Sequence, residues 1–234
     1  MRLGIIAGSV IAKEAFTENN YINTRWGRSS SGTMTTNLGG NECIFLARHG
    51  NPPDIPPHMI NHRANVKVLE ELNVDAVISV CSTGALRSNI EVPGFAVPSD
   101  YIDLFSSHTF HDNDIFHATP GLDRKIQKRL IEACGESGID TLSNCIYVQT
   151  RGPRLETRAE VSLLSTWGDV VGMNMGPEAT LCSELGMRAG SLLTVDNYAN
   201  GIGDKKPDFN EILTSARSNW EAILEVLSNL PERI

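Results

Sequence analysis

The stretch Thr150–Met187, TRGPRLETRAEVSLLSTWGDVVGMNMGPEATLCSELGM, decides the fold that the sequence predicts. It follows an apolar run at 145–149 and has a Gly-Pro pair at 152–153, a pattern typical of a strand that runs into a loop. An acidic turn at 156–160 with leucines behind it predicts a helix. A short apolar strand at 169–172 follows, and Pro177-Glu178 then opens a second helix at a position that tolerates proline.

The rest of the chain repeats this alternation of strands and helices. Short apolar runs predict strands at 3–6, 42–47, 76–80 and 191–195. Apolar residues at helical spacing predict helices at 58–73, at 122–134 and from Asp208 onward. Residues 95–105 contain Pro98 and predict a strand that is either bulged or at an edge. The alternation predicts an α/β fold: one domain over residues 1–234, with a central mixed, largely parallel twisted β-sheet flanked by helices.

Composition narrows the class of protein. A net charge of −8 argues against a nucleic-acid surface, because such surfaces neutralise phosphates with clustered Lys and Arg. No apolar run approaches the roughly 20 residues of a membrane span, so we expect no membrane partner. The five cysteines are odd in number and widely spaced, which fits reduced thiols in a cytoplasmic protein and predicts no metal site.

Polar residues gather at the ends of four predicted strands, and they suit an oxyanion. Such a ligand needs a multi-donor cation, hydroxyls and backbone N–H groups that converge on one point. Arg48 would supply the cation, and neutral donors would come from Ser9, Ser82 and Asn174. Each residue alone has a simpler explanation, since an arginine at a strand end is usually a surface salt-bridge partner. The residues by themselves leave the two interpretations about equal.

A resemblance to a known family favours the anion site. The segments 152–157 (GPRLET) and 171–178 (VGMNMGPE) resemble the purine nucleoside phosphorylases, and within them the trimeric methylthioadenosine and methylthioinosine phosphorylases. Further similar segments occur in the family's order at 45–50, 77–86 and 192–201. The resemblance implies a homotrimer that acts on a purine nucleoside with inorganic phosphate as co-substrate and no cofactor.

Site roles follow from the positions that match the family's motifs. The phosphate-binding residues that the resemblance implies are Ser9, Arg48, His49, Cys81, Ser82 and Asn174. The residues implied for the sugar and the base are Met173, Leu155, Glu156, Asn197, Ala199 and, from a neighbouring subunit, His117. Of these, Arg48, Glu156 and Asn197 are expected to be catalytic. Asn197 would hydrogen-bond the purine at N7 and O6, and Glu156 would accept a hydrogen bond from N1–H.

The implied reaction is phosphorolysis of the N-glycosidic bond, with a free base and a ribose 1-phosphate as products. A 6-oxopurine presents N1–H to Glu156, whereas a 6-aminopurine presents an acceptor, and Ala199 offers no hydrogen bond where the adenosine-specific branch has a carboxylate. We therefore expect a 6-oxopurine nucleoside such as 5′-methylthioinosine, inosine or guanosine, with methylthioinosine first. Asp196 leaves an alternative open, because a shift of one residue in the match to the family would place its carboxylate at the position that contacts the base.

Three departures from the family pattern keep other functions open. Val10 follows Ser9 where the family commonly has glycine, Asn174 replaces a usual threonine, and Leu155 replaces a common phenylalanine. A 5′-methylthioadenosine phosphorylase, a nucleoside hydrolase on the same fold and a non-catalytic nucleoside- or phosphate-binding protein are the alternatives.

Overall fold

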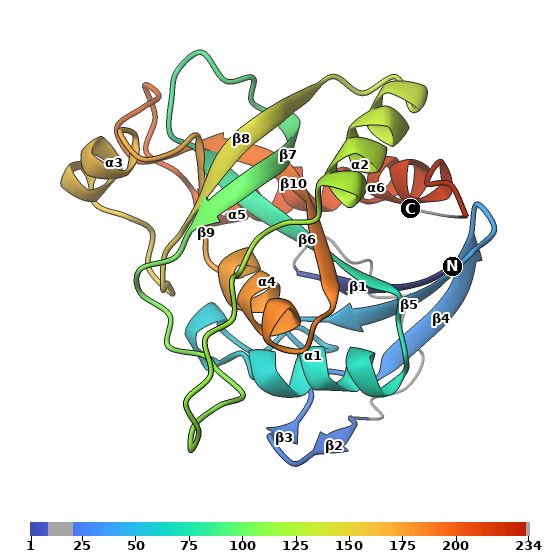
Figure 1. Ribbon diagram of the computed structural model, residues 1–234. Coiled ribbons are helices and arrows are strands. Elements are labelled where there is room, and N and C mark those ends of the chain that lie inside the picture. Colours follow the sequence, from blue (N-terminus) through green and yellow to red (C-terminus); the bar gives the residue numbers. More distant parts are fainter. Residues whose placement is uncertain (9–20, 233–234) are drawn as a thin grey trace.

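A mixed eight-stranded β-sheet forms the centre of the protein, in a computed structural model that describes residues 1–8 and 21–232 (Figure 1). Its strands, in spatial order, are β10 (Arg188–Tyr198), β7 (Gly94–Ile102), β8 (Thr141–Gln149), β9 (Val170–Gly172), β6 (Ala76–Ala85), β1 (Arg2–Ala7), β5 (Asn41–Ala47) and β4 (Thr33–Leu38). Most neighbouring pairs are parallel, and β4–β5, β6–β9 and β7–β10 are antiparallel. The expected mixed, largely parallel sheet is confirmed.

The sheet closes on itself, which the sequence did not predict. Strand β6 is long enough to pair with β1, with β10 and, at its last residues, with β9. The strands β6, β10, β7, β8 and β9 therefore form a barrel-like ring, from which β1, β5 and β4 extend as an open sheet. The expectation of a plain twisted sheet is corrected in this respect.

Helices cover both faces of the sheet because each has one apolar stripe to bury. On one face lie α1 (His62–Glu71) and α4 (Met175–Glu184), and on the other lie α2 (Arg124–Glu136) and α6 (Trp220–Ser228) (Figure 1). The remaining helical elements are η2 (Pro57–Met59), α3 (Arg158–Leu164) and α5 (Phe209–Ser218). A two-stranded hairpin, β2 (Asn23–Thr24) and β3 (Gly27–Arg28), packs beside α1. None of the described helices is long and apolar enough to cross a membrane.

At Pro98 the structure decides between two sequence expectations, and at Asn219 it differs from the expectation. Pro98 lies in an interior strand, β7, where a register shift against β8 accommodates the missing N–H donor, so the bulged alternative is confirmed. The C-terminal helix begins with an Asp208 cap, as expected, but it breaks at Asn219 into α5 and α6.

The parallel strands bring distant residues to one end of the sheet. Ala7 at the end of β1 lies opposite both Ala47 of β5 and Val80 of β6. Gly8, Arg48 and Cys81 come directly after these three residues, so their backbones are neighbours although the sequence separates them. Carboxyl ends of parallel strands are where α/β proteins bind ligands.

Candidate active site

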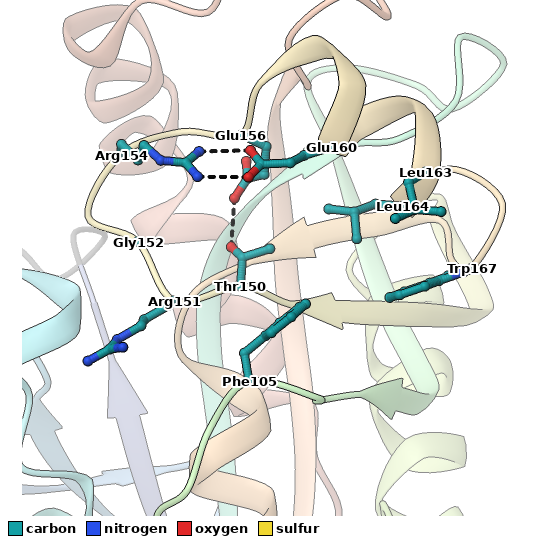
Figure 2. A pocket seen from close by; sticks show the side chains of 10 residues that line it. All are labelled: Phe105, Thr150, Arg151, Gly152, Arg154, Glu156, Glu160, Leu163, Leu164 and Trp167. Carbon is teal, nitrogen blue, oxygen red and sulfur yellow. Dashed lines mark hydrogen bonds and ion pairs between the residues drawn. The ribbon is translucent and has the colours of Figure 1, made fainter.

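A cavity of about 400 Å³ lies beside the loop that follows β8 (Figure 2). The loop contributes Thr150, Arg151, Gly152, Arg154 and Glu156, α3 contributes its apolar side chains, and Phe105 closes one side. The start of α3 is fixed by a capping box between Thr157 and Glu160. Arg154 makes two 2.7 Å hydrogen bonds to Glu160, so the loop is tied to the helix at the mouth of the cavity.

Glu156 is the acidic residue best placed to accept a hydrogen bond from a ligand in this cavity. Its side chain is 9% exposed, and its Oε1 accepts a 2.6 Å hydrogen bond from the Thr150 hydroxyl. Among the described residues, no hydrogen bond reaches Oε2. One carboxylate oxygen is therefore held by the protein while the other is available to a donor in the cavity.

A second cavity of about 190 Å³ adjoins the first, since Phe105, Thr150 and Arg151 line both. Its other walls carry Met173 and Pro177 from the start of α4, and three histidines: His58, His62 and His108. Burial, together with nearby positive charge, lowers the pKa of His108. Met173 lies against Gly152, where a side chain at residue 152 would collide with its sulfur atom.

Arg48 makes contacts that the sequence did not predict. Its side chain is fully buried, and its guanidinium donates to both oxygens of Glu178, with Nε–Oε1 at 2.5 Å and Nη2–Oε2 at 2.9 Å. Further acceptors are the carbonyls of Ile6 and Val80 and the sulfur of Cys81. Arg48 therefore does not present an open guanidinium fork to solvent, because Glu178 occupies the two-donor edge.

His49 and Gly8 lie directly beside the Arg48 guanidinium. A Cβ atom at Gly8 would meet Arg48 Nη1 at 2.8 Å and His49 Nε2 at 3.4 Å, so only glycine lets the backbone pass this close. His49 Nδ1 is 2.8 Å from the carbonyl of Ile55, which fixes the tautomer with hydrogen on Nδ1 and the lone pair on Nε2. Burial and the Arg48 charge lower the pKa of His49 to about 4.

Asn174 and Cys81 complete this part of the site. Asn174 is the N-cap residue of α4 but makes no side-chain cap, and its Oδ1 is buried without a hydrogen-bond partner. The Tyr147 hydroxyl accepts the backbone N–H groups instead, at 3.1 Å from Asn174 and 3.4 Å from Met175. The Asn174 side chain thus has a buried oxygen without a hydrogen-bond partner among the described residues. Burial raises the pKa of the Cys81 thiol to about 12, so it remains a neutral group.

Asp196 and Asn197, at the end of β10, make different contacts. Asp196 is 8% exposed and accepts hydrogen bonds from Thr194, Ser215 and Asn219 on the side of α5 and α6. The strand register shifts at this residue, and Asn197 pairs with Gly84 of β6. A Cβ at Gly84 would lie 3.3 Å from Asn197 Nδ2. Asp196 is therefore a structural carboxylate, and Asn197 is the residue on the other side of the strand.

Residues 199 and 200, directly after β10, contact β6 and the loop that carries Glu156. Asn200 Nδ2 donates to the Glu156 carbonyl at 3.2 Å, and Ala199 is buried against β6, where its N–H donates to the Ala85 carbonyl. Asn197 Nδ2 itself donates to the carbonyl of Tyr198 at 2.8 Å. Ser82 also acts on the Asp196 carboxylate, since its hydroxyl opposes the rise that burial causes in the pKa of Asp196.

Of the predicted site residues, only Glu156 and Met173 line these two cavities. The residues that line neither, although the structure describes them, include Arg48, His49, Cys81, Ser82, Asn174, Asn197 and Ala199. Ser9 lies outside the described residues. Leu155 is 40% exposed and lines neither cavity, and His117 is exposed in the loop between β7 and α2. Among residues 1–8 and 21–232, no group of three His, Cys, Asp or Glu side chains has the arrangement of a metal site.

Sequence reasoning missed Thr150, Tyr147 and Glu178 as site residues. Glu178 was assigned only to the first turn of a helix, yet it is followed by the apolar run 179–182 (ATLC), and its side chain is fully buried. A buried carboxylate in such a helix requires a buried cation as its partner. The apolar run after Glu178 was therefore a signal that could have indicated an arginine partner. Tyr147 and Thr150 offered no comparable signal.

Comparison with known proteins places the chain in a family. The pattern of the Phosphorylase superfamily matches residues 2–230. A probable 6-oxopurine nucleoside phosphorylase of Archaeoglobus fulgidus is 36% identical over 99% of this chain and 96% of its own length. A probable S-methyl-5′-thioinosine phosphorylase of Methanocaldococcus jannaschii is 34% identical over 97% of this chain and 90% of its own.

A solved structure shares the fold. Methylthioadenosine phosphorylase from Schistosoma mansoni, in complex with adenine, superposes with a TM-score of 0.84 over 98% of this chain and 90% of that chain. Its sequence is 21% identical, so the likeness concerns the fold alone. Together with the family pattern and the relatives above, it leads to one conclusion: the chain belongs to the phosphorylase superfamily.

Proposed function

We propose that the protein cleaves a 6-oxopurine nucleoside by phosphorolysis, releasing the free base and a ribose 1-phosphate. It would thus be a pentosyltransferase of the nucleoside phosphorylase type. The observation that carries this proposal is the Glu156 carboxylate at the wall of the larger cavity, with one oxygen held by Thr150. The second oxygen suits the N1–H of hypoxanthine or guanine and opposes the N1 lone pair of adenine. The names of the relatives support the same class of substrate.

Asn197 is proposed to stabilise the leaving base. The base gains negative charge at N7 as the glycosidic bond breaks, and an amide donor there strengthens its hydrogen bond in the transition state. One such donor is worth about 3 kcal/mol. Rotation of the Asn197 amide away from the Tyr198 carbonyl, 2.8 Å distant, would make Nδ2 available. Ala199 adds no polar group, and Leu155 lies at the outer edge.

Phosphate is proposed to lie between two neighbouring residues, Gly8 after β1 and His49 after β5, and the start of α4. The His49 lone pair on Nε2 can accept the O–H of monohydrogen phosphate, and the Asn174 amide can donate once its assigned oxygen and nitrogen are exchanged. Cys81 is proposed to line this space, and Ser9 is proposed as a further donor because it follows Gly8 in the sequence. Arg48 is the positive charge behind it. Met173 then packs against the sugar, which lies between the anion and the base.

The assembly and location of the protein are part of the proposal. We propose a cytoplasmic homotrimer with no cofactor, in which His117 of one subunit reaches the site of the next. The exposed position of His117 in a long loop is compatible with that contact. Sedimentation velocity tests the assembly, and a monomer at micromolar concentration would contradict it.

Base release from inosine, with and without phosphate, tests the function. The proposal predicts hypoxanthine release that requires phosphate, and a higher kcat/KM for inosine than for adenosine. Equal release without phosphate would identify a hydrolase instead. Binding of inosine without release would identify a non-catalytic binding protein.

A further inference from the structure

The Arg48–Glu178 pair is the most deeply buried charge pair among the described residues. Both side chains are fully buried, and two hydrogen bonds of 2.5 and 2.9 Å join them. Although burial raises the pKa of the Glu178 carboxyl, the Arg48 charge and its hydrogen bonds lower it to about 2. The pair is therefore an ionised pair with no net charge, in a region of low polarity.

Other contacts fix the pair in one orientation. The Ser79 hydroxyl donates to Glu178 Oε2 at 2.5 Å, and His62 Nδ1 lies 3.6 Å from Oε1, beyond hydrogen-bond length. Arg48 Nη2 and Nη1 also donate to the Ile6 and Val80 carbonyls. Nη1 carries a second N–H, and this nitrogen is the part of the guanidinium nearest to Gly8.

We propose that Glu178 is a positioning residue that sets the charge of the anion site. It holds Arg48 beside Gly8 and His49, and it offsets part of the charge that Arg48 would otherwise present to phosphate. Neutral donors then bind phosphate moderately, and the sugar phosphate, which carries the same group, leaves readily. The inference rests on the proposed function, because it assumes that an anion occupies this place.

The physical reason is electrostatic. A divalent anion a few ångströms from an uncompensated buried guanidinium would be bound far more tightly than in water, because the surroundings screen the charges poorly. Tight binding of substrate and product alike does not speed the chemical step, and it slows release. A carboxylate on the far edge of Arg48 weakens the attraction, while Nη1 keeps its remaining N–H near Gly8.

Glu178→Gln tests the inference because it removes the negative charge while keeping a side chain of the same shape. The three other acceptors of Arg48 are unchanged, and the new amide oxygen can still accept from Nε. We expect KM for phosphate to fall roughly tenfold while KM for inosine stays within about twofold. The variant should have a lower Tm than the wild type, and phosphate should raise its Tm by a larger amount.

Two further variants provide controls. Asp123→Asn makes the same carboxylate-to-amide change beside Arg188, at the opposite end of β10 from Asn197, and should leave both KM values unchanged. The double variant Arg48→Met, Glu178→Met replaces the pair with apolar side chains of similar length, which proteins often tolerate. It should fold, and phosphate should raise its Tm less than that of the wild type.

The outcomes separate this inference from the proposed function. A phosphate response of Glu178→Gln equal to that of the wild type, in KM and in Tm, would overturn the inference alone. If Glu178→Gln does not fold, the double variant provides the test of the inference. A phosphate-induced Tm shift of the double variant equal to that of the wild type would overturn the inference. A wild-type protein that shows no phosphate dependence at all would remove the proposed function and this inference together.

Discussion

Tyr147→Phe tests how the fold positions the start of α4. The buried Tyr147 hydroxyl accepts the backbone N–H groups of Asn174 and Met175 and donates to Gln149 Oε1 at 3.2 Å. The variant leaves two buried donors without an acceptor, one from a good bond of 3.1 Å and one from a long bond of 3.4 Å. Each orphaned group costs about 1–3 kcal/mol, so we expect a loss of about 2 kcal/mol in the free energy of unfolding.

This loss is measurable by thermal and urea denaturation. For a chain of 234 residues it corresponds to a fall in Tm of roughly 4–8 °C. The same change loosens Met173-Asn174, so KM for phosphate should rise severalfold while the fold is retained.

Tyr101→Phe is the matched control. Its hydroxyl bonds to Thr180 on the same helix at 2.7 Å, but away from the helix start. It should cost about 1 kcal/mol and leave KM for phosphate unchanged. If Tyr147→Phe is as stable as the wild type and has the same phosphate KM, the proposed role of the hydroxyl is wrong.

Three other predictions address the base and the anion. Asn197→Asp should raise the ratio of kcat/KM for adenosine to that for inosine, and an unchanged ratio would contradict the placement of the base. Glu156→Gln should lower kcat/KM for inosine by about 10- to 100-fold and spare adenosine. The single oxygen of the glutamine amide would stay with the Thr150 hydroxyl, so its NH2 group would face the N1–H of the base. Equal losses for both substrates would contradict a specific contact. The His49 pKa of about 4, depressed from 6.5, means that the unfolded chain binds a proton between these values while the folded chain does not. Stability should therefore be retained above about pH 6.5 and fall by roughly 3 kcal/mol toward pH 4, and His49→Asn should flatten that part of the urea-denaturation profile; an unchanged slope would refute it.

The strands and helices were predictable because their signals are local. Apolar runs end at punctuating Gly, Pro and polar residues, and the Thr157–Glu160 and Asp208 caps stand where the sequence predicted helix starts. Closure of the sheet was not predictable, because it depends on β6 pairing with β9 and β10, which lie far from it in the sequence. The single-domain organisation of 1–234 remains a prediction.

For the site residues too, local signals were predictable from the sequence and long-range contacts were not. Asn197 and Asp196 are adjacent, and only the register shift in β10 determines which one faces α5 and α6. Arg48 was interpreted as an open ligand because its partner, Glu178, is 130 residues away. A motif indicates that a residue belongs to a site, but its contacts depend on long-range packing.

The central claim is that phosphate, rather than water, accepts the sugar. ³¹P NMR of the protein with inosine and inorganic phosphate tests this most directly. We predict that the phosphate signal is replaced by that of a sugar 1-phosphate, in a one-to-one ratio with the hypoxanthine released. Hypoxanthine release with an unchanged phosphate signal and free ribose in solution would contradict the account.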